Sequence, residues 1–141
     1  MPHLKITNGQ PETYSIGQLR RDNPNTSFPK SPSDALLADW GVYSYTMQDR
    51  PVYDHLTRTI RQLDITQVDG AWTQGWEIVT LPTEGASRNI RNQRDNLLQQ
   101  TDWMALSDVT MSAETTTYRQ ALRDITEQAG FPYAVVWPTK P

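Results

Sequence analysis

Residues 83–100 read TEGASRNIRNQRDNLLQQ, and their pattern predicts a helix over 84–100. Ile90, Leu97 and Leu98 recur at i, i+7 and i+8, a spacing that places them on one helix face. The threonine at the start of the stretch is a favourable N-cap, and the glutamate after it suits the positive end of the helix dipole. The helix follows Pro82, where the pattern of the sequence changes from strand-like to helix-like.

A second helix is predicted over 112–129, with Ser112 as its N-cap and Gly130 as its stop. Its apolar residues recur at i, i+4, i+7 and i+11 and are Tyr118, Leu122, Ile125 and Ala129. A connection of about ten residues separates the two helices, which is within the usual length for neighbouring helices. The pattern therefore favours an antiparallel helical hairpin.

The start of the chain is irregular. Five prolines punctuate residues 1–39, and proline removes a backbone donor and disfavours a helical residue before it. A short helical turn is predicted at 15–21. A helix of about two turns is predicted after Ser33, a suitable cap, and before Gly41, a suitable stop.

Strand patterns follow this leader. VYSYTMQ at 42–48 alternates apolar and polar residues, and 53–68 is rich in Thr, Ile and Val, so at least part of it is predicted to be strand. Asp69-Gly70 is the strongest hairpin feature of the chain, and the strand-like AWTQGWEIVTL comes directly after it. The first half therefore predicts a small antiparallel sheet.

Together these patterns predict an α+β fold. A β-rich lobe with a proline-rich leader occupies residues 1–81, and a helical hairpin with an extended tail occupies 82–141. Within the tail, a short strand is predicted at 133–137 between two prolines. One hypothesis is that this tail lies along the sheet edge of a partner.

Composition argues against several classes of function. The net charge is -3 and no basic stripe occurs, so nucleic-acid binding is not expected. Cysteine is absent, which removes disulfides, thiolate metal sites and cysteine nucleophiles. No apolar run approaches the roughly 20 residues of a membrane helix. We expect a protein that needs no membrane and is made in a cytoplasm.

Catalytic and cofactor motifs are not found. His3 and His55 lack metal-ligand neighbours, and no phosphate-binding loop or nucleophile elbow occurs. We therefore expect neither an enzyme nor a cofactor. A pair of glycosidase-type carboxylates is the distant alternative. The aspartates of the second half lie among arginines, which lower the pKa of a carboxyl group and make it a poor general acid.

The arginines and aspartates instead predict a structural network. Double Arg–carboxylate bonds are geometrically specific, so such a network ties the two helices and their connecting loop together. On this hypothesis Arg94→Ala or Asp102→Ala costs stability, roughly 3–5 kcal/mol for a buried charge left alone. The residues concerned are Arg88, Arg91, Arg94, Asp95, Asp102, Asp108, Arg119, Arg123 and Asp124.

The tryptophans allow two interpretations. Trp72, Trp76, Trp103 and Trp137 are spread over strand, loop and tail. They either form the core between sheet and helices, or some of them are exposed anchors for a partner, because Trp, Tyr and Arg dominate binding hot spots. Both interpretations stay open.

The second half also carries an ordered series of motifs over roughly 82–141. These are R-x-x-R-D-x-L-L, then T-D-W, then Y-R-x-x-L-R-D, and finally G-F-P and W-P. The residues are Arg91, Arg94, Asp95, Leu97, Leu98, Thr101, Asp102, Trp103, Tyr118, Arg119, Leu122, Arg123, Asp124, Gly130, Phe131, Pro132, Trp137 and Pro138. The series closely resembles the phage tail assembly chaperone family, also described as tail-fibre assembly proteins. The first half resembles the leader of such proteins more loosely.

The resemblance implies a phage tail protein that binds tail-fibre or baseplate proteins and assists their assembly in the host cytoplasm. The alternative is a structural component that is retained in the virion tail fibre or baseplate. Either role allows homo- or hetero-oligomers. The residues expected to support the scaffold or contact a partner are Arg91, Arg94, Asp95, Asp102, Trp103, Tyr118, Arg119, Arg123, Asp124 and Trp137.

Overall fold

The computed structural model describes residues Met1–Pro141 and has the α+β composition that the sequence predicts. The chain forms two compact units. The first unit consists of Met1–Pro51 and Ile60–Glu77, and the second consists of Val52–Thr59 and Ile78–Pro141. The chain passes from one unit to the other at three points, after Pro51, Thr59 and Glu77. The last two lie within β5 (Arg58–Gln62) and β8 (Trp76–Thr80), which pair as a two-stranded sheet.

The first unit begins with an antiparallel sheet in the order β2-β1-β3. Its strands are β1 (His3–Thr7), β2 (Gln10–Thr13) and β3 (Val42–Ser44). Asn8 and Gly9 both have positive φ values, 52° and 78°, which is the backbone of a tight hairpin turn. This hairpin was not predicted, because the neighbouring prolines dominated the interpretation of the leader.

The two short helices of the first unit are α1 (Ile16–Asp22) and α2 (Asp34–Asp39). Both lie where the sequence predicts a helix, and the Ser33 hydroxyl caps α2 by accepting from the Leu36 N–H. Leu19, Leu37 and Val42 form one buried cluster at these helices. The apolar faces of the helices therefore close on β3.

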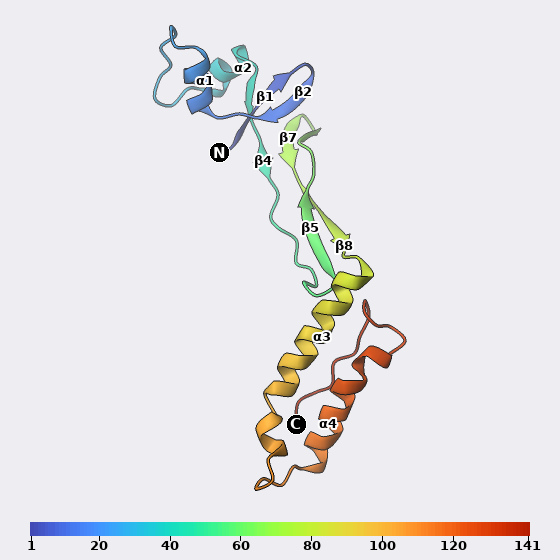
Figure 1. Cartoon of the computed structure of the whole chain (residues 1–141). Helices are drawn as coiled ribbons and strands as arrows, with labels where there is room; N and C mark the ends of the chain where they lie inside the picture. Colours follow the sequence, from blue (N-terminus) through green and yellow to red (C-terminus); the bar gives the residue numbers. More distant parts are fainter. The chain divides into compact units, whose positions relative to one another are not determined.

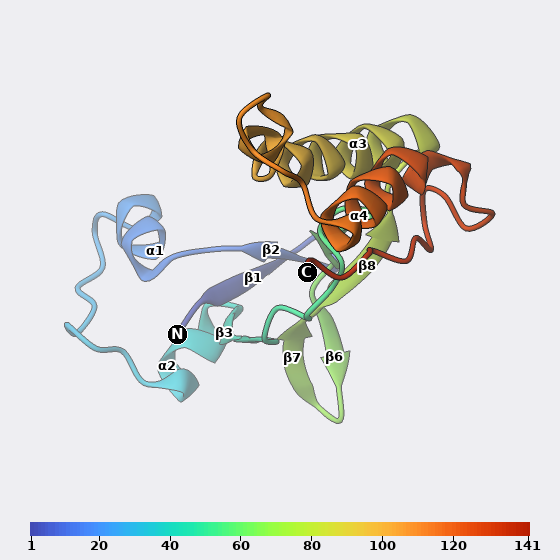
Figure 2. The same ribbon diagram turned by 90° about the horizontal axis from the view of Figure 1, so that it is seen from below.

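A second sheet of the first unit has the order β4-β7-β6. Its strands are β4 (Thr46–Met47), β6 (Thr66–Val68) and β7 (Ala71–Gln74), and Figure 2 shows β6 and β7 as one hairpin. Asp69 and Gly70 turn this hairpin with φ values of 49° and 81°, so the predicted Asp-Gly turn is confirmed. Leu4, Tyr45 and Ile65 form the buried cluster beside it, and Trp72 packs against them.

The second unit is a helical hairpin followed by the tail. Its elements are α3 (Thr83–Gln99), the 3-10 turn η1 (Asp102–Ala105), α4 (Ala113–Arg123) and the 3-10 turn η2 (Asp124–Glu127). Figures 1 and 2 both show α3 and α4 side by side, and the chain runs in opposite directions along them. Each helix buries one face, and the buried residues are Ala86, Ser87 and Ile90 on α3 and Thr115, Tyr118 and Leu122 on α4.

Three details of the second unit differ from the sequence prediction. The N-cap of α3 is Pro82, and Thr83, the predicted cap, is the first residue of the helix. The Thr83 hydroxyl does not cap the helix and lies 3.1 Å from the hydroxyl of Tyr133. The second helix ends at Arg123 and tightens into η2, so it is shorter than the predicted 112–129. The predicted strand at 133–137 does not form, because a side chain occupies the backbone groups that a neighbouring strand would use, as described below.

Candidate partner-binding loops of the helical unit

Four large exposed apolar side chains of the second unit lie on two loops, and the two others, Val52 and Ile78, lie outside them. The connecting loop, residues 100–112, carries Trp103 and Leu106, and Trp103 is 56% exposed. The C-terminal loop, residues 128–137, carries Tyr133 and Val136, and Val136 is 77% exposed. Single exposed apolar residues are common on protein surfaces. What distinguishes these four is the way in which the backbone beneath them is held.

Arg119 holds the start of the connecting loop. Its Nη1 donates to the Leu98 carbonyl at 2.9 Å and to the Thr101 hydroxyl at 2.7 Å. Its Nη2 donates to the Asp102 carboxylate at 3.0 Å. The arginine thus joins the N–H and the hydroxyl of Thr101 as donors to a carbonyl of the last turn of α3, where carbonyls have no partner within the helix. One side chain of α4 therefore fixes both the end of α3 and the residue before Trp103.

The rest of the connecting loop is a series of hydrogen-bonded turns. The Met104 N–H donates to the Thr101 carbonyl, and the Leu106 N–H donates to the Trp103 carbonyl. The loop ends at Ser112, whose hydroxyl caps α4 by accepting from the Thr115 N–H at 3.1 Å. Trp103 therefore projects from a backbone with defined bonds on both sides.

Gln128 holds the C-terminal loop in a comparable way. Its side-chain amide donates to the Val136 carbonyl at 2.8 Å, and its side-chain oxygen accepts from the Val136 N–H at 2.7 Å. These two bonds occupy both backbone groups of Val136, as a neighbouring strand would. The tail consequently turns back on itself at a residue whose own side chain is exposed.

The same loop is closed tightly at Gly130. The Gly130 carbonyl accepts from the Ala134 N–H at 2.7 Å. A Cβ atom at position 130 would lie only 2.1 Å from the Ala134 carbonyl oxygen, a separation that no folded protein tolerates. Glycine is therefore required at this position by the close approach of the backbone.

Tyr133 fastens the C-terminal loop to the start of α3. Its hydroxyl donates to the Leu81 carbonyl at 2.8 Å and lies 3.1 Å from the Thr83 hydroxyl. Phe131 is on the same loop, and the guanidinium of Arg91, a residue of α3, lies over its ring at 5.6 Å from the centroid. The loop is thus tied to two places on α3 by side chains outside the turn itself.

A pocket of about 260 Å³ lies beneath the C-terminal loop. Its lining includes Asp54, Thr57, Ile90 and Trp137. The Thr57 hydroxyl donates to the Asp54 carboxylate at 2.6 Å, and the Leu56 N–H donates to it at 2.9 Å. These two bonds lower the pKa of Asp54, the hydroxyl having the larger effect. This carboxylate stays ionised and braces a turn, which is not the behaviour of a general acid.

The predicted network of arginines and aspartates forms only in part. Arg119 and Asp102 make the expected bridge from α4 to the connecting loop. Arg94 pairs with its neighbour Asp95 at 2.8 Å, and therefore does not join the helices. On α4, Gln120 donates to Asp124 and accepts from Arg123. These contacts stay within α3, or within α4 and the turn that follows it, and do not join the helices. Gln120 reaches residues three and four positions along the chain, which lie on the same side of a helix.

The other candidate residues have separate environments. Tyr118 is buried on the inner face of α4. Trp103 is exposed and Trp137 lines the pocket beneath the C-terminal loop. Trp72 packs in the core of the first unit, and the Trp76 indole donates to the Gln48 carbonyl at 3.0 Å. The tryptophans thus do not share a single core, and Trp103 is placed as an exposed anchor would be.

Sequence reasoning did not identify Gln128 or Thr101 as framework residues, and it assigned Gly130 only the role of a helix stop. No pattern in the sequence marks a glutamine whose amide will pair with a backbone eight positions later. The motif Gly130-Phe131-Pro132 is visible in the sequence. Its glycine is required because the fold brings the backbone of Ala134 close to position 130, and the sequence does not show this contact.

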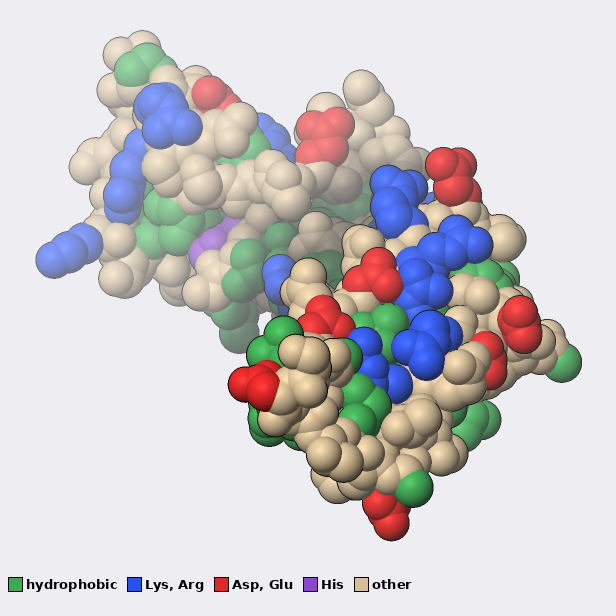
Figure 3. Space-filling model, turned by 60° about the horizontal axis from the view of Figure 1, so that its bottom comes forward, with side chains coloured by type: hydrophobic (Ala, Val, Ile, Leu, Met, Phe, Trp, Pro, Cys, Tyr) green, Lys and Arg blue, Asp and Glu red, His purple; other side chains and the backbone are tan.

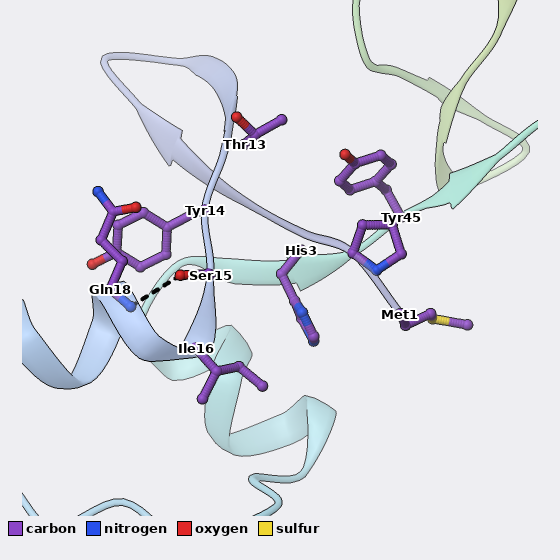
Figure 4. A pocket seen from close by; sticks show the side chains of 9 residues that line it. Met1, His3, Thr13, Tyr14, Ser15, Ile16, Gln18 and Tyr45 are labelled. Carbon is purple, nitrogen blue, oxygen red and sulfur yellow. Dashed lines mark hydrogen bonds between the residues drawn. The ribbon is translucent and has the colours of Figure 1, made fainter.

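The first unit has a larger pocket of about 560 Å³. Figure 4 shows that His3, Tyr14, Ile16 and Tyr45 line it. The Tyr14 hydroxyl donates to Asp22 at 2.5 Å, and burial together with this bond raises the pKa of Tyr14 to about 12. Tyr14 is therefore neutral over the physiological range. The chain has no group of three or more His, Cys, Asp or Glu side chains that could hold a metal ion.

None of the helices combines the length and the apolar character that crossing a membrane requires. Residues 87–141 match the model of a family described as phage tail assembly chaperone protein. No curated protein and no solved structure matches the chain. The matched region contains α4, nearly all of α3, and both loops with their four exposed apolar side chains.

Proposed function

We propose that the chain has a role in phage tail assembly and binds tail-fibre or baseplate proteins during their assembly, a proposal supported by the match of residues 87–141 to the phage tail assembly chaperone protein family. The observation that carries this proposal is the exposure of Trp103 on a loop that Arg119 holds in place. Binding takes place in the host cytoplasm, where tail polypeptides are made.

The chemistry of Trp103 suits a binding anchor. Tryptophan is enriched among the residues that contribute most to protein interfaces, because it buries a large area with few rotatable bonds. Leu106, one turn further along the same loop, extends the apolar surface. A partner that covers both side chains removes them from water, at roughly 25 cal/mol per Å² of apolar area.

The framework beneath the loops favours binding in a second way. Ordering a mobile loop costs conformational entropy when a complex forms, and a loop that is already ordered avoids that cost. Arg119 supplies this order in the connecting loop, and Gln128 supplies it in the C-terminal loop. Val136 is thereby presented as a second, fixed apolar contact.

The proposal assigns no catalytic step to the chain. Three carboxylates of the second unit that could be considered for catalysis already have partners. Asp102 accepts from Arg119, Asp95 accepts from Arg94, and Asp54 accepts from Thr57. The bonds to Asp54 lower its pKa, whereas acid catalysis requires a carboxyl group that holds its proton near neutral pH.

Affinity capture with the tagged chain from infected cells tests the proposal. The parent chain should capture a tail-fibre or baseplate protein, and Trp103→Ala should reduce the capture at least tenfold. Val136→Ser should also reduce the amount of tail protein captured. Val52→Ser is the matched control, because Val52 is also highly exposed, at 98%, but lies on neither loop.

Two results would contradict the proposal. One is that the parent chain captures no tail protein under conditions in which tails assemble. The other is that Trp103→Ala and Val136→Ser capture as much as the parent. Folding of each variant is checked by its circular dichroism spectrum and melting temperature. An assay of purified mature particles for the chain then distinguishes transient assistance from retention.

A further inference from the structure

One face of the helical unit carries a concentration of positive charge. Figure 3 shows Lys and Arg side chains gathered there, with Asp and Glu side chains around them. The two helices of the hairpin hold five arginines, Arg88, Arg91 and Arg94 on α3 and Arg119 and Arg123 on α4. The hairpin helices contain no lysine, so their positive charge is carried by guanidinium groups alone.

Three of these five arginines have no carboxylate partner. The ion pairs of the hairpin are Arg94 with Asp95 and Arg119 with Asp102. Arg88 is exposed and makes no side-chain hydrogen bond, Arg91 lies over Phe131, and Arg123 donates only to the neutral side chain of Gln120. We call Arg88, Arg91 and Arg123 the arginine face.

The spacing of the arginine face suits paired carboxylates. Arg88 and Arg91 are three positions apart on α3, which places their Cβ atoms about 5–6 Å apart on neighbouring turns. Stacking on Phe131 restrains the guanidinium of Arg91 without using its N–H groups, so its planar fork stays available for a two-point bond. A carboxylate accepts such a fork with both of its oxygens.

Arg123 extends this face from α3 to α4. Arg119 reaches from α4 to the last turn of α3, and Arg123 lies one turn further along the same side of α4. Its guanidinium is exposed and donates to Gln120 of the same helix. An extended segment lying along the hairpin would meet positive charge from both helices.

We propose that the arginine face binds an acidic segment of the tail polypeptide. The identity of that polypeptide rests on the proposed function, whereas the preference for carboxylates rests on the three unpaired guanidinium groups. A nucleic acid fits this face less well, because acidic side chains surround the arginines in Figure 3. The net charge of the chain is also negative, at -3, and a continuous phosphate backbone would meet those acidic groups.

Direct binding of peptides tests this inference without the tail protein. The probes are a fluorescent twelve-residue peptide of alternating Glu and Ser, the same peptide with Gln in place of Glu, and a twelve-nucleotide single-stranded DNA. The full chain should bind the Glu peptide at least tenfold more tightly than the Gln peptide. The double variant Arg88→Glu/Arg123→Glu should lose this binding at least tenfold, and Arg88→Gln/Arg123→Gln should lose it in part.

Arg21→Glu/Lys30→Glu is the control, because it makes the same change of charge on two exposed residues of the first unit and should leave peptide binding unchanged. Equal binding of the Glu and Gln peptides, or an unchanged affinity in both double variants, would overturn the inference. DNA that binds as tightly as the Glu peptide and is lost in the same variants would also overturn it and identify a nucleic-acid site instead.

Capture from infected cells separates this inference from the proposed function. If the parent and Arg88→Gln/Arg123→Gln capture the tail protein equally, the proposed function stands and the inference is wrong. If the parent captures no tail protein, the proposed function is wrong, while selective binding of the Glu peptide would still support the arginine face as a carboxylate site.

Discussion

The Nη1 atom of Arg119 and the carbonyl oxygen of Leu98 lie 2.9 Å apart, so a side chain of α4 completes the last turn of α3. The same guanidinium reaches Thr101 and Asp102, and the side chain of Arg119 is only 12% exposed. The two helices and the loop between them are therefore joined at a single residue. This relationship is the part of the predicted Arg–Asp network that the fold contains.

Arg119→Met should destabilise the helical unit by about 2–3 kcal/mol, because a largely buried charged donor and its bonds to Leu98, Thr101 and Asp102 are lost. Urea unfolding followed by circular dichroism measures the change. Asp102→Ala should cost less than about 1 kcal/mol, since this carboxylate is 59% exposed and exposed ion pairs contribute little. Equal costs for the two variants would show that the ion pair, and not the bonds to Leu98 and Thr101, dominates.

Gly130→Ala should destabilise the chain by about 1–3 kcal/mol, because the new Cβ forces the backbone at Ala134 to move. Gly85→Ala is the matched control. Gly85 lies within α3 and has nothing within 4 Å of the position of its Cβ, so alanine should stabilise the helix by about 0.5–1 kcal/mol. Melting temperatures should therefore shift in opposite directions, and a shift of both in the same direction would contradict the described loop.

Gln128→Ala should free the backbone of Val136, because both of its hydrogen bonds come from that side chain. Amide hydrogen exchange at Val136 should accelerate by roughly tenfold, which corresponds to about 1.4 kcal/mol of local stability. Exchange at Leu122, which is fully buried in α4, should be unchanged. Slow exchange that persists at Val136 in this variant would mean that another group protects it.

The stability of the chain should depend on Asp54 at low pH. The bonds from Thr57 and Leu56 lower the pKa of Asp54 in the folded state below its usual value, which is about 3.9 in an unfolded chain. The folded state gains from this difference at any pH above the unfolded value. The gain is lost as the pH falls through the folded pKa, because the folded carboxylate then takes up its proton as well.

Unfolding midpoints of the parent and of Asp54→Asn, measured between about pH 2 and pH 6, test this sign. The parent should lose more stability than the variant as the pH falls across that range. Thr57→Val removes the hydroxyl donor and should raise the pKa of Asp54 as measured by NMR titration. A pKa of Asp54 above about 3.9 in the parent would contradict the bonds described here.

The sequence predicted features that depend on neighbouring residues. The Ser33 and Ser112 caps and the Asp69-Gly70 turn are local and are present. Of the predicted apolar stripes, Ile90, Tyr118 and Leu122 are buried in α3 and α4, whereas Ala129 lies beyond the helix and is exposed. The Asn8-Gly9 turn is equally local, but the prolines near it led to the prediction of an irregular leader.

Contacts between distant positions could not be predicted in this way. The partner of an arginine depends on which groups the fold brings within reach. Arg119 donates hydrogen bonds to Leu98 and Thr101, whereas Arg94 forms an ion pair only with its neighbour Asp95. The strand predicted at 133–137 does not form, for a related reason. Its alternating residues are compatible with a strand, but the Gln128 amide already occupies the hydrogen-bonding groups of Val136.

The bonds that close the C-terminal loop have a consequence for its evolution. Gln128 and Gly130 hold Ala134 and Val136 entirely through main-chain atoms, so the side chains at positions 134 and 136 play no part in that hydrogen bonding. Selection can exchange them for larger, charged or aromatic residues while the curvature of the segment is preserved. Single substitutions can thus alter the surface that this loop presents, without rebuilding the fold that displays it.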